Sequence, residues 1–446
     1  MGWREAFAGG RYREILAIAG PMILANISPP LIGLVDTAVV GHLGDAHYIG
    51  AVAVGAVILS FTFTALNFLR MTTTGLAAQA AGAGDATRLR TVLAQATGTA
   101  LYLGGLLLLV QVPLGALAMR LIEPSAAVAD AAWDYYAIRI WSAPAALVNF
   151  ALIGWFIGLG NARAPLAMVV AANATNVVLD LILVPGFGFA VRGVAWASLV
   201  AEYVGAALGA RLVARELARH PGHWLRAEIL HIKGLRAFFA ANAALFLRTL
   251  LLMFAFAFLT TMGARQTDAI LAANAILVNL QYLMAYVLDG FANAAESLAG
   301  RAIGARDRAG VAAIVRDCLA WTLVLALAIA LLFAVAGPLA IRVVTNVPSV
   351  IEAAYRYLPW MVLSPLVCAW AFLYDGVFVG AQRPGAMFGV MLVAVVAVFL
   401  PVWWVTRSFG NHGLWFAFTV FNAARGLQQH LIFRDWMRRG SLLEVR

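Results

Sequence analysis

Two acidic residues, Asp36 and Asp180, stand inside long apolar stretches of the sequence. A charge at the centre of an apolar, membrane-spanning helix costs about 2.5–3.5 kcal/mol, so each of these residues needs a partner or a function. At 1.5 Å per residue, Asp36 lies about 34 Å of helix beyond Arg13, and Asp180 about 22 Å beyond Pro165. Two carboxyl groups held close together at similar depth do not both ionise cheaply. The pair therefore predicts a site for a proton or another small cation.

Polar and helix-distorting residues accompany both acids at helical spacing. Asn173, Asn176 and Asp180 lie three and four residues apart and so share one helix face. In the first stretch, Pro29 and Gly33 share a face with Asp36, and prolines there remove backbone hydrogen bonds. Both helices are therefore expected to turn a polar or small-residue face toward other helices rather than toward lipid.

A third polar stripe follows a single helix face in the second half of the chain. Its spacing of alternately three and four residues joins Asn279, Tyr282, Tyr286, Asp289, Asn293 and Glu296. We expect this stripe to line a cleft in which the two tyrosines stack on a flat cationic compound. Asp289 is either a second coupling site or the ion partner of Arg248, and Glu296 is assigned to an interfacial ion pair with Arg301.

The composition indicates that these residues are held by membrane-spanning helices. Of 446 residues, 63% are hydrophobic and 12% charged, about half the charged share of soluble domains, which excludes a lone soluble enzyme. Twelve apolar stretches reach the roughly 20 residues that cross a bilayer. They are, approximately, Glu14–Val40, Tyr48–Leu69, Thr91–Met119, Trp133–Gly160, Leu166–Pro185, Gly193–Leu212, Leu235–Met262, Ile270–Gly300, Val311–Ile341, Ala353–Gly380, Gly385–Val405 and Gly413–Phe433.

The 31 basic residues set the expected orientation. They are scattered between apolar blocks, which favours membrane topology over a nucleic-acid partner. With a cytoplasmic N-terminus most of them fall on the cytoplasmic side, so we expect a multi-pass protein of the cytoplasmic (inner) membrane with both termini in the cytoplasm.

Motifs recur along the chain with a shift of 222 residues. AGAGD ending at Asp85 returns as IGARD ending at Asp307, and FIG at 156–158 returns as FVG at 378–380. The shift predicts an all-α fold of twelve transmembrane helices in two pseudo-two-fold lobes of six, with a cleft between them. The lobes are residues 1–215 and 236–446, the latter with a short basic tail, joined by a cytoplasmic linker at 216–235. Such repeats are typical of transporters.

Four motifs also carry a family resemblance: VDTAVVGHLG at 35–44, NVVLDLILV at 176–184, LDGFANAAESLAG at 288–300 and DGVFVGAQRP at 375–384. Together they resemble the multidrug and toxic compound extrusion (MATE) transporters, most closely the DinF-type branch. The resemblance implies a secondary antiporter that exports small amphipathic, often cationic organic compounds by alternating access, in exchange for H⁺ or Na⁺.

The resemblance also suggests roles for individual residues. In proton-coupled members, the positions matching Pro21, Asp36, Asn176 and Asp180 form a protonation site whose state bends the first helix. Ser198, where such members often have Thr, is a weaker addition, and Asn173 joins the set through the polar stripe. In Na⁺-coupled members an acid on the tenth helix helps to bind the cation, which makes Asp375 a second candidate cation site. The acid that those members carry on the seventh helix is not evident here, and the coupling ion stays open.

Other classes of function have less support. No His-Glu-x-x-His motif, no phosphate loop and no catalytic cluster occurs, and Cys318 and Cys368 stand alone in apolar runs, so we expect no enzyme, metal or cofactor. A flippase for lipid-linked precursors, of the same superfamily, is the alternative; it would need a strongly basic cavity. A sugar-type facilitator would carry a Gly-x-x-x-Asp-Arg/Lys loop that is absent here. We expect the protein to be a monomer.

Overall fold

The computed structural model describes residues 11–43, 45–225, 229 and 232–442. Contacts divide the chain into two compact units, Leu24–Phe238 and a second formed by Met1–Ile23 with Phe239–Arg446. We call them the first and second lobes and describe each by itself. The division after Phe238 lies close to the predicted start of the second lobe at residue 236.

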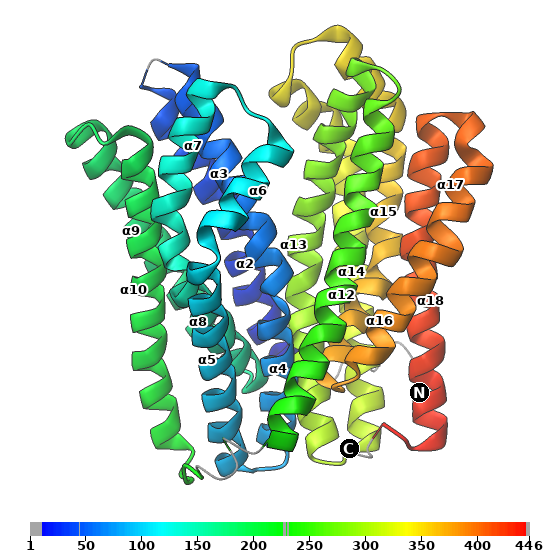
Figure 1. Cartoon of the computed structure of the whole chain (residues 1–446). Coiled ribbons are helices and arrows are strands. Elements are labelled where there is room, and N and C mark those ends of the chain that lie inside the picture. The colour runs from blue at the N-terminus through cyan, green and yellow to red at the C-terminus, as the bar shows by residue number, and fades with distance from the viewer. Residues whose placement is uncertain (1–10, 44, 226–228, 230–231, 443–446) are drawn as a thin grey trace. The chain divides into compact units, whose positions relative to one another are not determined.

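The first lobe contains helices that follow one another in short connections (Figure 1). Helix α2 (Arg11–Gly41) enters it at Leu24, and α4 and α5 pack along α8. The elements are α3 (Ala46–Leu66), α4 (Phe68–Gly82), α5 (Ala86–Leu109), α6 (Gln111–Ile122), α7 (Ala126–Arg139), the 3₁₀ turn η1 (Ile140–Ser142), α8 (Ala143–Gly158), α9 (Arg163–Leu181), the π-helical turn η2 (Ile182–Gly186) and α10 (Ala190–Arg219).

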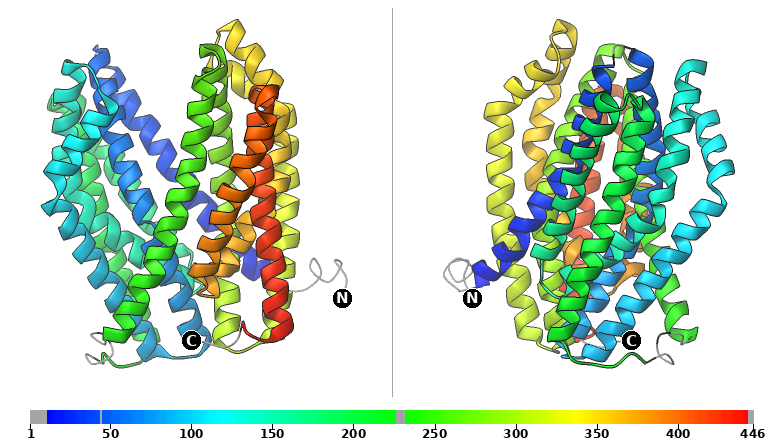
Figure 2. Two further views of the ribbon diagram at one scale, coloured as in Figure 1. Left: turned by 45° about the vertical axis from the view of Figure 1, so that its right-hand side comes forward. Right: turned by 90° about the vertical axis from the view of Figure 1, so that its left-hand side faces the viewer.

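The second lobe is built on longer helices, of which α13, α14 and α15 lie side by side (Figure 2). Its elements are α12 (Ile232–Ala264), α13 (Asp268–Gly304), α14 (Arg308–Val344), α15 (Pro348–Gly380), α16 (Pro384–Val393), the π-helical turn η3 (Ala394–Phe399), α17 (Leu400–Thr406), the 3₁₀ turn η4 (Arg407–Phe409) and α18 (Asn411–Arg439).

The N-terminal part of α2 packs with the second lobe, although residues 1–215 were predicted to form the first. Two ion pairs hold it there: Arg11 binds the buried Asp317 of α14 at 3.1 Å, and Glu14 binds Arg301 of α13 at 3.0 Å. Sequence periodicity alone does not reveal such contacts, because their partners lie about 300 residues away.

The second predicted span is longer than its apolar stretch. We expected it to end at Leu69, but α3 and α4 together run to Gly82 with a single break at Asn67. The polar run after Leu69 stays helical because hydroxyl groups bond back to carbonyls one turn earlier: Thr73 donates to Leu69 at 2.6 Å and Thr74 to Arg70 at 2.9 Å.

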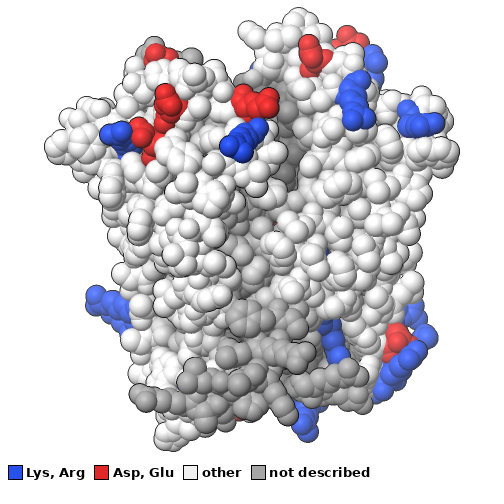
Figure 3. All heavy atoms as spheres, in the orientation of Figure 1, with Lys and Arg blue, Asp and Glu red and all other residues white. Residues whose placement is uncertain are grey.

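Eleven of the described helices are long and apolar enough to cross a membrane. The twelfth, α18, is not among them, because it carries polar residues on a buried face, namely Asn411, Asn422, Arg425 and Gln429. Charged side chains on the face seen in Figure 3 gather toward the two ends of the helices and leave the middle almost uncharged, as a bilayer requires.

The repeat appears in the structure as matching close contacts. A Cβ atom at Gly158 would lie 2.7 Å from the Thr74 carbonyl oxygen, so α8 and α4 approach closely only because this residue is glycine. Its counterpart Gly380 meets the carbonyl of Glu296 in the same way, and Thr74 and Glu296 are again 222 residues apart. Small residues at such crossings let helices pack tightly in a membrane. Each lobe is therefore assembled around the same helix crossing.

Candidate functional site

Asp36 of α2 and Asp180 of α9 are brought together inside the first lobe, as predicted from their depth. Their side chains interact with each other, and 8% of Asp36 and none of Asp180 is exposed. Among the described residues, no group donates a hydrogen bond to either carboxylate oxygen of Asp180 while both acids are ionised. A proton between the two carboxyl groups would supply the missing hydrogen bond.

The predicted polar residues of α9, which share a helix face with Asp180, bind the neighbouring helices. Asn176, one turn before Asp180, donates from Nδ2 to the Ser198 hydroxyl of α10 at 3.1 Å, and Asn173 donates to the Ser28 hydroxyl of α2. These bonds tie α9 to its neighbours on both sides. The backbone of α9 changes to the π-helical turn η2 two residues after Asp180, a deviation that often marks a functional site.

Pro21 lies fifteen residues before Asp36 on α2, which continues through it as one helix. It belongs to the segment that packs with the second lobe. Its role as a bending point therefore stays a prediction.

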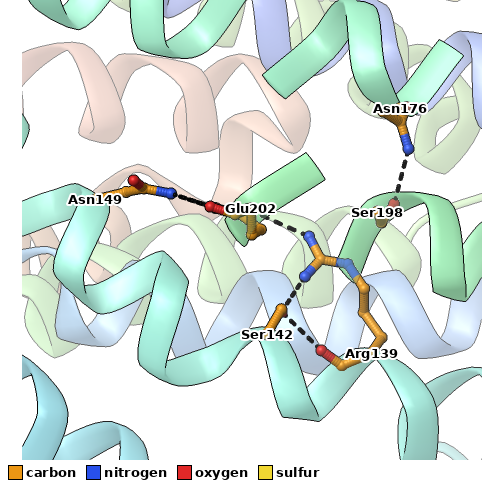
Figure 4. A network of polar contacts seen from close by, with 6 residues as sticks. All are labelled: Arg139, Ser142, Asn149, Asn176, Ser198 and Glu202. Atoms are coloured by element: carbon orange, nitrogen blue, oxygen red, sulfur yellow. Dashed lines mark hydrogen bonds and ion pairs between the residues drawn. The ribbon is translucent and has the colours of Figure 1, made fainter. Parts of the chain in front are cut away.

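Sequence reasoning missed a second polar cluster in the first lobe, which Figure 4 shows together with Asn176 and Ser198. Arg139, the last residue of α7, binds the Ser142 hydroxyl and pairs with Glu202 of α10 at 3.4 Å. Asn149 of α8 donates to Oε2 of Glu202 at 2.9 Å. The available signal was the opposite charge of Arg139 and Glu202, since each is an ionisable residue inside an apolar helix that needs a partner.

The second lobe holds Asp375 in a network of basic groups. Arg425 Nη2 lies 2.7 Å from Oδ2 of Asp375, Arg248 of α12 binds the same oxygen, and Gln429 donates to Oδ1 at 2.6 Å. All three donors are positioned by α12 and α18 against α15. Two guanidinium groups thus occupy the positions around Asp375 that a bound cation would need. Arg248 pairs with Asp375 rather than with Asp289, its expected alternative partner.

The residues of the predicted stripe on α13 become more buried along the helix, from Asn279 to Asn293. Asn279 is exposed, Tyr282 is 40% exposed and stacks on Phe256 with ring centroids 5.1 Å apart, and Tyr286 and Asp289 are half-buried. Asn293 is buried. The turns of α13 around Asn279 and Tyr282 therefore leave amide and aromatic groups exposed, while the turn at Asn293 is packed, and the predicted role of this stripe in binding a compound stays a prediction.

No group of three His, Cys, Asp or Glu side chains suited to a metal ion occurs in the described part of the chain. Cys318 and Cys368 are both buried free thiols.

A family model, MatE, matches the chain twice, over residues 21–182 and 244–405. The chain belongs to the MatE family. It is accordingly a multi-pass membrane transporter rather than an enzyme. The double match also supports the internal repeat.

Relatives and solved structures agree with the MatE assignment. DNA damage-inducible protein F of Escherichia coli K12 is 40% identical over 442 residues, 98% of this chain and 95% of that protein, which confirms the DinF-type resemblance. A probable multidrug resistance protein NorM of Bradyrhizobium diazoefficiens is 30% identical over 91% of this chain and 90% of its own. A crystal structure of MATE in the bent conformation matches with a TM-score of 0.88 over 99% of this chain and 98% of its own at 18% identity. This last likeness confirms the twelve-helix fold.

Proposed function

We propose that the protein is a secondary antiporter of the cytoplasmic membrane that works as a monomer, exports amphipathic, often cationic organic compounds, and takes up protons in exchange. The observation that carries the proposal is the buried pair Asp36 and Asp180, in which no group among the residues described donates a hydrogen bond to Asp180 while both acids are ionised. The cargo class is supported by a relative whose name is probable multidrug resistance protein.

Protons suit this pair because two adjacent carboxyl groups in a poorly hydrated site repel each other unless one is neutral. Na⁺ at the same carboxylates is the direct competitor. A second cation site at Asp375 has less support, because Arg248 and Arg425 already bind that carboxylate. The same contacts weaken the case for a lipid-precursor flippase, since these arginines are engaged rather than open to a pyrophosphate.

Protonation is expected to act through α2. When both carboxyl groups are protonated, Asp36 loses the charge with which it attracts polar groups on α9. The hydrogen bond between Asn173 and Ser28 also connects α2 to this face of α9. Pro21 gives α2 a position with one backbone hydrogen bond fewer, where bending is easier. Bending of α2 is expected to release cargo outward, and deprotonation toward the cytoplasm restores the straight helix, provided that the two states differ in proton affinity.

The test is export of ethidium by purified protein in liposomes under an imposed pH gradient. Asp36→Asn and Asp180→Asn are expected to abolish pH-driven export while leaving the protein folded. Asp134→Asn is the matched control, because Asp134 is an acid of the same lobe that pairs with Arg192 and is 43% exposed. Undiminished export by both site variants would refute the site, and wild-type export that follows only a Na⁺ gradient would refute proton coupling.

The proposed orientation places both termini in the cytoplasm. A cysteine introduced at Leu225, which is 41% exposed, should then resist membrane-impermeant reagents added to intact cells, and labelling there would reverse the orientation. Within the predicted linker at 216–235, residues 226–228 and 230–231 lie outside the described residues.

A further inference from the structure

Arg139 stands among three carboxyl groups in the first lobe. Glu202 of α10 faces its guanidinium group, the charge of Arg139 also acts on Asp36 of α2, and Asp180 of α9 adjoins Asp36. Tyr135 on its own helix is the other titratable neighbour. Helices α3, α6 and α8, which pack against α7 and η1, contain no Asp or Glu. One guanidinium group thus faces Glu202 and acts on Asp36, while Asp180 reaches it only through Asp36.

The contact between Arg139 and Glu202 is loose, whereas Glu202 is held firmly by another residue. The separation of 3.4 Å exceeds the 2.7–2.9 Å typical of charge-assisted hydrogen bonds. Asn149 Nδ2 lies 2.9 Å from the Glu202 carboxylate and 3.0 Å from its backbone oxygen. Glu202 therefore keeps hydrogen bonds from Asn149 when Arg139 turns away, which lowers the cost of that movement.

The backbone at Arg139 places its side chain at a junction between two helices. Arg139 ends α7, and the next three residues form the 3₁₀ turn η1 before α8 begins. Short 3₁₀ stretches between helices often act as hinges. The Ser142 hydroxyl in this turn donates to the Arg139 carbonyl oxygen at 2.7 Å and accepts from its guanidinium group, so it steadies the side chain at the junction.

We propose that Arg139 is a positioning residue for proton coupling, whose guanidinium group is held by Glu202 while the Asp36–Asp180 pair carries its protons and turns to Asp36 when a proton leaves. The proposal rests on the proposed coupling role of the carboxyl pair. Its consequence is that Arg139 and Glu202 set the pH at which the pair releases protons, with opposite effects. Without Arg139 the ionised pair loses its counter-ion, and without the Glu202 carboxylate Arg139 stays with Asp36.

The test measures the proton on the pair directly, without transport. A hydrophobic carbodiimide reacts with protonated carboxyl groups, and mass spectrometry of full-length protein in detergent reports the labelling of Asp36 and Asp180 at each pH. The midpoint of Arg139→Gln is expected about one pH unit above that of the wild type, the lower end of the effect of an opposite charge at close range. The midpoint of Glu202→Gln is expected to move in the opposite direction.

Two variants serve as controls. Arg139→Lys keeps the charge and is expected to return the midpoint toward the wild-type value. Arg192→Gln removes an arginine from an ion pair between the same two helices, but its side chain is 64% exposed and 2.9 Å from Asp134, so no shift is expected.

The outcomes separate this inference from the proposed function. Midpoints for Arg139→Gln and Glu202→Gln that equal the wild type, or that move in the same direction, overturn the role of Arg139 even if the Asp36 and Asp180 variants lose coupling. If Arg139→Gln does not fold, the direction of the Glu202→Gln shift decides. Intact proton-driven export by Asp36→Asn and Asp180→Asn overturns the proposed function itself.

Discussion

If Asp375 is the counter-ion of two buried arginines, removing its charge should destabilise the protein. If Asp375 is a cation site, the same change should stabilise it. Asp375→Asn keeps the size of the side chain but removes the charge that holds Arg248 and Arg425. Their side chains are only 10% and 3% exposed, so both guanidinium groups stay buried without a counter-ion. If Asp375 were instead an empty cation site, removing its charge would relieve an unpaired acid and stabilise the protein.

The size of the effect follows from the geometry. Arg425 lies 2.7 Å from Asp375, and Arg248 binds the same oxygen. Each such pair is worth about 4 kcal/mol at a charge separation of about 4 Å and an effective dielectric constant of about 20. The residual hydrogen bonds of Asn recover part of the loss, and breaking one partner of a buried ion pair typically costs about 3–5 kcal/mol. We expect the free energy of unfolding to fall by about 4 kcal/mol.

The assay is unfolding in mixed micelles by titration with sodium dodecyl sulfate. Arg356→Gln is the matched control on the same helix, because its pair with Glu352 at 3.0 Å is 59% and 75% exposed and is worth about 0–1 kcal/mol. Replacing Asp375, Arg248 and Arg425 together by Leu, Met and Leu should recover most of the lost stability. A loss for Asp375→Asn no larger than that of the control, or a gain, would refute the network.

Three further outcomes are expected. Gly158→Ala should destabilise the protein by about 1–3 kcal/mol by forcing α8 from α4, whereas Gly98→Ala, with open space around its Cβ, should be neutral or stabilising; melting temperatures in detergent compare them. The hydrogen bond that the backbone N–H of His47 donates to Asp45 holds the pKa of Asp45 below its ordinary 3.8. The stabilisation from this helix cap is therefore present above pH 3.8 and is lost as the pH falls through the lower pKa of the folded protein. Amide exchange at His47 should therefore be faster in Asp45→Ala at neutral pH, with no difference in acid. Tyr282→Ala should alter the resistance of cells to different organic cations at equal protein level, because Tyr282 is exposed on α13. An unchanged resistance profile would refute the prediction that this stripe contacts the exported compound.

The sequence was sufficient for the membrane fold, the repeat and the meeting of Asp36 with Asp180. Apolar length predicts a span, and depth along a helix follows from residue counting. The recurrence of glycine at the repeat distance can be read from the sequence. The structure explains it, because helices cross there too closely for a Cβ atom. The extension of the second span to Gly82 was missed because hydropathy does not register hydroxyl groups that bond back to their own helix.

The partners of the buried charges were not predictable in the same way. Arg139 and Glu202 are 63 residues apart, and Arg425 and Asp375 are 50 apart, on helices whose relative rotation the sequence does not state. A shift of one residue turns a side chain by about 100° around its helix, enough to change its partner. The sequence therefore shows that each charge needs a partner, and the packing decides which charges meet.

The two lobes share a helix crossing but hold opposite excess charges in their buried polar clusters. Asp36 and Asp180 correspond, at the repeat distance of 222, to the apolar Phe258 and Val402, and Asp375 corresponds to Ile153. The cluster in the first lobe has more carboxyl groups than guanidinium groups, while in the second lobe one carboxylate, Asp375, binds two guanidinium groups. An excess of buried carboxyl groups can be balanced only by taking up protons or other cations, whereas Asp375 is already paired within the protein. Ion coupling should therefore reside in the first lobe, where the balance of charge can change during transport.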